Sequence, residues 1–74
     1  MIRNITSHDV IGVLKKKGWA HVGTKGSHWQ FKHPTKKGRV TVPHPKKSLG
    51  SGTIKSILRQ AGLTDEEFEE CLKN

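Results

Sequence analysis

The chain has a single cysteine, Cys71, among its 74 residues. One cysteine excludes an internal disulfide and any zinc site built from several thiolates, so Cys71 is expected as a small core residue. The five histidines show no paired helical spacing, and a carboxylate ligand would have to come from Asp9 or from the acidic C-terminal segment. We therefore expect no metal site and no cofactor.

Long apolar runs are also missing. No stretch approaches the roughly 18 apolar residues that a membrane span requires, and the N-terminus lacks the apolar segment of a signal peptide. These features predict a cytoplasmic protein without membrane contact.

A chain of this length is expected to form one domain, residues 1–74. Its free energy of unfolding should be roughly 4 to 11 kcal/mol, at about 0.05 to 0.15 kcal/mol per residue.

Acidic residues are scarce outside the C-terminal segment. Residues 1–63 hold thirteen basic residues and one acid, a net charge of +12, whereas residues 64–74 hold one basic residue and five acids, a net charge of −4. Such a polycation favours a polyanionic partner, nucleic acid above all, with an affinity that falls as salt rises. A solvated basic surface with no specific partner is the alternative.

The first predicted helix begins after Thr6 and ends at Gly18. Thr6 can act as its N-cap and form a capping box with Asp9. Apolar residues then recur at helical spacing until the three lysines 15–17, which complement the negative end of the helix dipole. That structural role gives these lysines only a minor share in any binding site.

Two more helices are predicted after residue 50. From Ile54 the apolar residues recur at i, i+3, i+4 and i+7, with Ser51 or Thr53 as the N-cap and Gly62 as the end. Residues 64–67 then predict a capping box for a short last helix. Three side chains of that helix are expected to pack on the body: Phe68, Cys71 and Leu72.

Between the helices the sequence predicts three antiparallel strands, residues 19–24, 28–33 and 39–42. The fold class is therefore α+β, with a helix, a three-stranded antiparallel sheet, a helix and a short C-terminal helix. Helices on one face would leave the other face of the sheet to solvent. This is the layout of double-stranded-RNA-binding domains, which recognise RNA shape through phosphates and 2′-hydroxyls.

The turn at residues 25–28 is the strongest candidate for a functional site. Gly26 lets the backbone bend close to a ligand, Lys25 offers an ammonium to a phosphate, and His28 begins the second strand. Histidine exchanges protons near neutral pH, so an exposed one among lysines suits general acid-base chemistry on a phosphodiester. The alternative is that His28 is only a polar strand residue beside a hairpin.

The alternation of the second strand separates its polar and apolar side chains. His28, Gln30 and Lys32 should lie on the solvent face. Trp29 and Phe31 should lie on the opposite face as core residues. A second basic loop, residues 46–52, precedes a helix, where a lysine pair suits a phosphate. The candidate RNA-binding residues are Lys25, Gly26, Ser27, Lys32, Lys46 and Lys47.

From Ser7 to Leu63 the chain resembles the HicA toxins, the RNA-cleaving partners of HicB antitoxins. Five motifs in order carry this resemblance: residues 15–19, 25–28, 31–34, 40–45 and 52–63. It implies that His28, at the family's Gly-Ser-His position, is the catalytic histidine of a metal-independent endoribonuclease. It also implies cleavage of mRNA and neutralisation by a HicB antitoxin.

Two other readings fit the composition. A non-catalytic double-stranded-RNA-binding module would need the fold and the charge but not His28. A structural protein associated with the ribosome would need only the basic surface.

Overall fold

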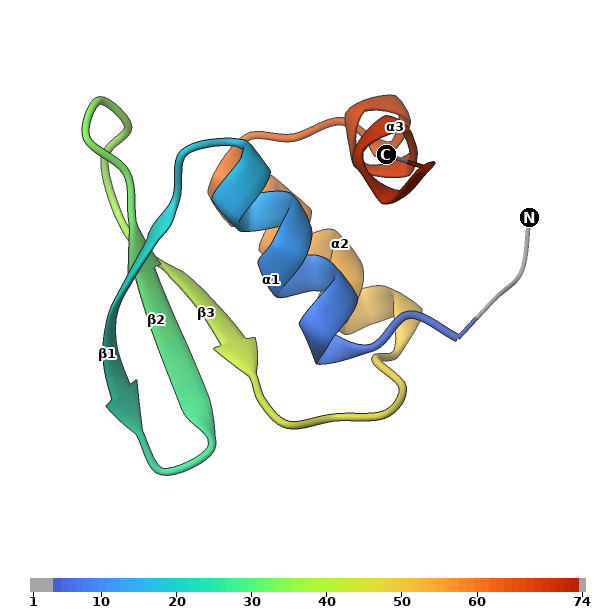
Figure 1. Ribbon diagram of the computed structural model, residues 1–74, viewed down its shortest axis with the longest axis horizontal. Coiled ribbons are helices and arrows are strands. Elements are labelled where there is room, and N and C mark those ends of the chain that lie inside the picture. The colour runs from blue at the N-terminus through green and yellow to red at the C-terminus, as the bar shows by residue number, and fades with distance from the viewer. Residues whose placement is uncertain (1–3, 74) are drawn as a thin grey trace.

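Three helices and three strands make up the computed structural model, which describes residues 4–73 (Figure 1). Their order confirms the predicted α+β layout. In sequence the elements are α1 (Ser7–Lys16), β1 (Ala20–Lys25), β2 (His28–Lys32), β3 (Val40–Pro43), α2 (Ser51–Ala61) and α3 (Asp65–Lys73). No helix within residues 4–73 combines the length and the apolar composition needed to cross a membrane.

The sheet is antiparallel in the order β1-β2-β3. Its strands differ by about one residue from the predicted bounds, for local reasons. Trp19 lies outside β1 because its backbone N–H donates to the Leu14 carbonyl, 2.9 Å away, and so closes α1. β3 extends to Pro43, which pairs with His28. A proline is tolerated there because β3 is an edge strand.

Helix α1 begins and ends as the sequence predicts. Thr6 and Asp9 form the capping box, and Gly18 follows the helix with a positive φ of 94°. A Cβ at Gly18 would lie 2.9 Å from Nε2 of His33. That imidazole donates from Nε2 to the Lys17 carbonyl (3.0 Å) because its Nδ1 accepts the N–H of Thr35 (3.1 Å). His33 is therefore a structural residue that closes the end of α1.

The predicted N-cap of α2 is wrong. Gly50 takes that position with an extended backbone and without a side-chain hydrogen bond, and Ser51 already lies inside the helix. Gly62 ends α2 at a φ of 70°, as predicted. The capping box of α3 is confirmed, since Thr64 N–H donates to the Glu67 carboxylate (2.9 Å) and Glu67 N–H to the Thr64 hydroxyl (3.1 Å).

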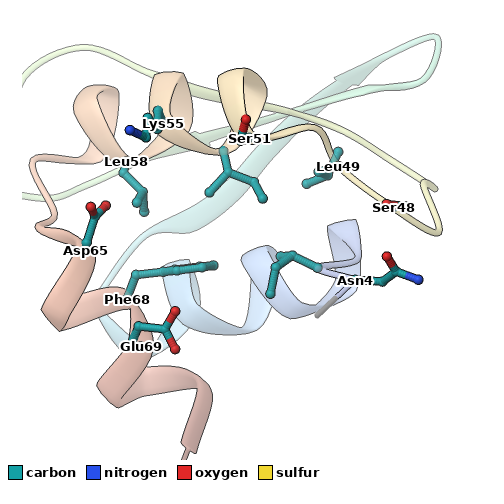
Figure 2. Close-up of a pocket in the computed structure, with 11 residues that line it drawn as sticks. Asn4, Ser48, Leu49, Ser51, Lys55, Leu58, Asp65, Phe68 and Glu69 are labelled. Atoms are coloured by element: carbon teal, nitrogen blue, oxygen red, sulfur yellow. The ribbon is translucent and has the colours of Figure 1, made fainter. Parts of the chain in front are cut away.

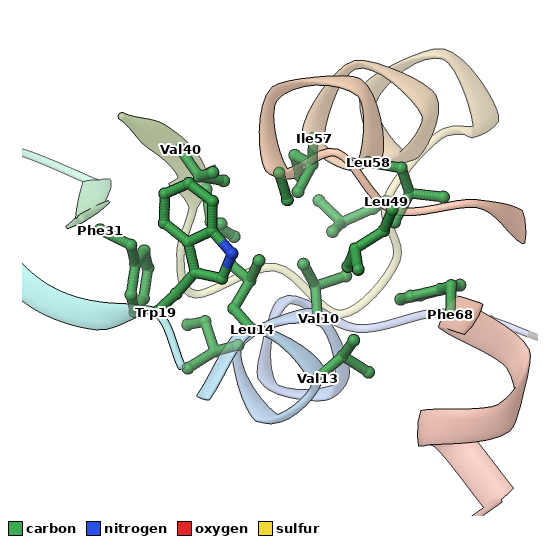
Figure 3. Close-up of a cluster of buried hydrophobic side chains, with 14 of the residues drawn as sticks. Val10, Val13, Leu14, Trp19, Phe31, Val40, Leu49, Ile57, Leu58 and Phe68 are labelled. Atoms are coloured by element: carbon green, nitrogen blue, oxygen red, sulfur yellow. The ribbon is translucent and has the colours of Figure 1, made fainter. Parts of the chain in front are cut away.

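The core lies between the helices and one face of the sheet (Figure 3). Phe31 is fully buried, as predicted, and α3 contributes Phe68. Trp29 corrects the prediction, because it is only partly buried at the margin of this core. The helices pack over β3, whereas the β1–β2 hairpin extends away from them (Figure 1). On the β1–β2 hairpin, the face that continues the core face of the sheet is therefore left without a helix over it.

Candidate catalytic and nucleic-acid-binding site

A two-residue turn, Gly26 and Ser27, delivers His28 to the end of the sheet. Lys25 and His28 are the last pair of the β1–β2 ladder, directly opposite each other. Gly26 has a φ of 62°, as the first central residue of a tight type II′ hairpin turn requires. All four residues of this turn are exposed. An imidazole and an ammonium therefore lie side by side at an open end of the sheet.

The face of β2 that carries His28 faces solvent, as predicted. Lys32 is exposed on the same face but lies four residues along the strand, roughly 13 Å from His28. Between them lies Gln30, whose side-chain oxygen accepts a 2.6 Å hydrogen bond from Nη1 of Arg39. The structure thus adds Arg39, which was not among the predicted site residues, and separates Lys32 from the histidine.

The basic loop after β3 is tied to the same end of the molecule. The His44 backbone N–H donates to the Ser27 carbonyl, 2.7 Å away. Ser7, almost fully buried at the start of α1, accepts the Lys46 N–H at its hydroxyl (2.9 Å) and contacts Nδ1 of His44 (2.6 Å). Lys46 and Lys47, two and three residues after His44, are exposed in this loop.

A family described as "HicA toxin of bacterial toxin-antitoxin" matches residues 7–63. The chain belongs to the HicA toxin family. The match runs from α1 to the end of α2 and includes the hairpin turn and the basic loop. Membership in a toxin–antitoxin family gives the toxin an antitoxin as its partner. No curated protein matches the chain.

Three aromatic rings of the toxin meet on the other face of the hairpin, and we call them the ring cluster: His21, Trp29 and His44. His21 stacks on Trp29 with ring centroids 4.2 Å apart and an interplanar angle of 16°. His44 meets Trp29 edge-on, with centroids 4.5 Å apart at 74°. Neither histidine was predicted to have a role. The sequence contained one signal for His21. Side chains alternate between the two faces of a strand, so His21 lies on the same side as Trp19, which is the core side.

A hollow of about 420 Å³ lies on another side of the toxin, between α2, α3 and the segment before α1. Leu58 and Phe68 point into it (Figure 2). It contains none of the predicted site residues. Within residues 4–73 no three His, Cys, Asp or Glu side chains gather in a group that could hold a metal ion.

Proposed function

We propose that this toxin is an endoribonuclease that cleaves mRNA without a metal ion, with His28 as its catalytic residue. The observation that carries the proposal is the exposed His28 beside Lys25 at the open end of the sheet. Membership in the HicA family supports it, because His28 stands in the Gly-Ser-His motif inside the matched segment. We further propose that a HicB antitoxin neutralises the toxin and that both act in the cytoplasm.

RNA carries its own nucleophile, which reduces the chemistry that the protein must supply. The 2′-hydroxyl loses its proton and its oxygen forms a bond to phosphorus, while the bond from phosphorus to the 5′-oxygen breaks and that oxygen takes up a proton. His28 performs one of these proton transfers, a contribution of about 100- to 10,000-fold. One imidazole cannot make both transfers at once, so water or the substrate supplies the other and turnover is modest.

The lysines supply electrostatic stabilisation of the phosphorane. Lys25 is adjacent to His28 in the ladder, and Lys46 and Lys47 lie in the loop tied to Ser27. Gly26 and Ser27 contribute an exposed backbone that a phosphate can approach closely. Lys32, at the far end of β2, contacts a phosphate other than the scissile one. These residues together bind the RNA backbone independently of base sequence.

The reaction products test this function. Purified toxin is incubated in EDTA with end-labelled RNA, and the new termini are identified. We expect a 2′,3′-cyclic phosphate and a 5′-hydroxyl, because the attacking oxygen stays on phosphorus. DNA and RNA with 2′-O-methyl at the scissile position should bind without being cut. Efficient cleavage of either would exclude the mechanism, and binding of RNA without cleavage would favour the non-catalytic RNA-binding module.

A further inference from the structure

We propose that the stacked rings of His21 and Trp29 form a platform for an unpaired nucleobase, which makes single-stranded RNA the substrate of this toxin. The inference rests on the proposed ribonuclease function and specifies the form of RNA that it accepts. The general layout of the fold instead suggests recognition of duplex RNA by its shape.

The two rings form a stacked pair that is partly exposed. The rings of His21 and Trp29 are nearly parallel, 4.2 Å apart between centroids, and the His21 side chain is exposed. The Phe31 ring, buried in the core, lies tilted at 46° with its centroid 5.4 Å from that of His21, so the imidazole packs against two rings and still keeps an exposed part. A further planar ring can pack against that exposed part. Nucleobases stack on histidine and tryptophan in this way, whatever their sequence, because every base has a π-face.

Neighbouring groups hold both rings before any ligand binds. Nε2 of His21 is hydrogen-bonded to the Thr24 hydroxyl at 2.9 Å. The His44 ring meets the Trp29 ring edge-on. The Ser7 hydroxyl, 2.6 Å from Nδ1 of His44, holds that imidazole in place. Little rotamer freedom is then left to lose on binding, and preorganisation of this kind favours affinity.

The platform lies close to the proposed catalytic residue. Trp29 follows His28 directly in β2, with its side chain on the opposite face of the sheet, and its partner Thr24 is one residue from the turn. A single strand that passes around the hairpin turn would present a phosphate to His28 on one face and a base to the rings on the other. A duplex cannot do this, because its bases are already stacked on each other.

Trp29 packs against the margin of the core, yet it is placed differently from the other tryptophan. Trp19, the other tryptophan, is only 2% exposed inside the core, whereas Trp29 stays partly exposed beneath two imidazoles. The surroundings also differ from a protein-docking patch. Among residues 4–73 the one large hydrophobic side chain that is exposed is Val22, and contiguous apolar area is what marks protein interfaces. Flat polar rings without such area favour a base over a protein side chain.

The test measures binding to a short 2′-O-methyl RNA, which the toxin cannot cut, and to copies with one base removed at successive positions. A change in tryptophan fluorescence reports occupancy, because Trp19 is buried in the core and of the two tryptophans only Trp29 can meet a base. We expect quenching on binding. We also expect that one abasic position weakens affinity about 5- to 150-fold. His21→Ala should remove this discrimination, while His21→Tyr, which restores a ring, should recover it. Val22→Ala, an exposed change in the same strand, should behave like the wild type.

The outcomes separate this inference from the proposed function. Either of two results would overturn the platform and leave ribonuclease activity standing. One is that wild type and His21→Ala bind RNA equally well and no abasic position is sensitive. The other is a preference for duplex RNA. Failure to bind any RNA would overturn both. If His21→Ala weakened capture of the antitoxin but not of RNA, the rings would belong to a protein interface and the inference would be wrong.

Discussion

Replacing Ser7 with alanine should loosen the loop that carries His44 and Lys46. Ser7 is 1% exposed at the first position of α1. Its hydroxyl accepts the Lys46 N–H at 2.9 Å, lies 3.3 Å from the Lys46 carbonyl and contacts Nδ1 of His44 at 2.6 Å. Alanine nearly preserves the volume of the side chain, so the change removes these polar contacts without opening a large cavity.

The expected cost follows from the groups left without a partner. A buried donor or acceptor that loses its hydrogen bond costs about 1 to 3 kcal/mol. The Lys46 N–H and the His44 ring are partly buried, so water recovers part of this loss, and the backbone bond from Ser7 N–H to the Lys46 carbonyl remains. We expect a total loss of about 2 kcal/mol. That is a substantial fraction of the roughly 4 to 11 kcal/mol expected for the chain.

Urea denaturation followed by tryptophan fluorescence measures this loss. With a slope of about 1 kcal/mol per molar urea for a chain of this size, the midpoint should fall by about 2 M. Ser56→Ala is the matched control, because Ser56 is exposed on α2 and accepts one long contact of 3.5 Å from Gln60. Its midpoint should move by less than about 0.5 M. Equal, small effects of both substitutions would refute the role assigned to Ser7.

Three further predictions concern charge, pH and the partner. Lys25→Ala should reduce the salt dependence of RNA binding by about 0.7 units of the logarithmic slope, whereas Lys15→Ala should leave it unchanged; equal slopes would contradict the placement of Lys25. The Thr64 N–H lowers the pKa of the Glu67 carboxyl, so the capping contribution to stability should be present at neutral pH and be lost as pH falls through that lowered pKa. Glu67→Gln, which keeps the cap, should remove this pH dependence in circular dichroism, and an unchanged acid transition would refute it. Hydrogen exchange of the toxin in complex with its antitoxin should show protection of residues 25–32. The reason is that an acidic partner covering the His28 face would complement the positive net charge of residues 1–63. An inhibitory complex that leaves residues 25–32 unprotected would exclude occlusion of this face.

Local signals predicted the elements of this fold accurately. The capping boxes at Thr6 and Thr64 involve residues three positions apart, so the sequence contains both partners. Alternation in β2 likewise placed His28 on the solvent face and Phe31 in the core. The N-cap of α2 was missed because an extended Gly50 fulfils it without a side-chain hydrogen bond, which leaves no side-chain pattern to recognise.

Contacts between distant segments could not be predicted in the same way. Trp29 has the alternation of a core residue, but its burial depends on how far the helices extend over the sheet, and they stop at β3 and part of β2. The link between Ser7 and His44 joins residues 37 positions apart. The ring cluster depends on both features, so neither His21 nor His44 could be assigned from its neighbours in sequence.

The rate of RNA cleavage by His28→Ala, measured in EDTA at saturating protein, tests the central claim most directly. We expect a loss of at least about 100-fold, with the urea midpoint unchanged because His28 is exposed and packs little. His8→Ala, which removes an exposed histidine from α1, should cut at the wild-type rate. A folded His28→Ala variant that cleaves RNA as fast as the wild type would show that His28 is not the catalyst.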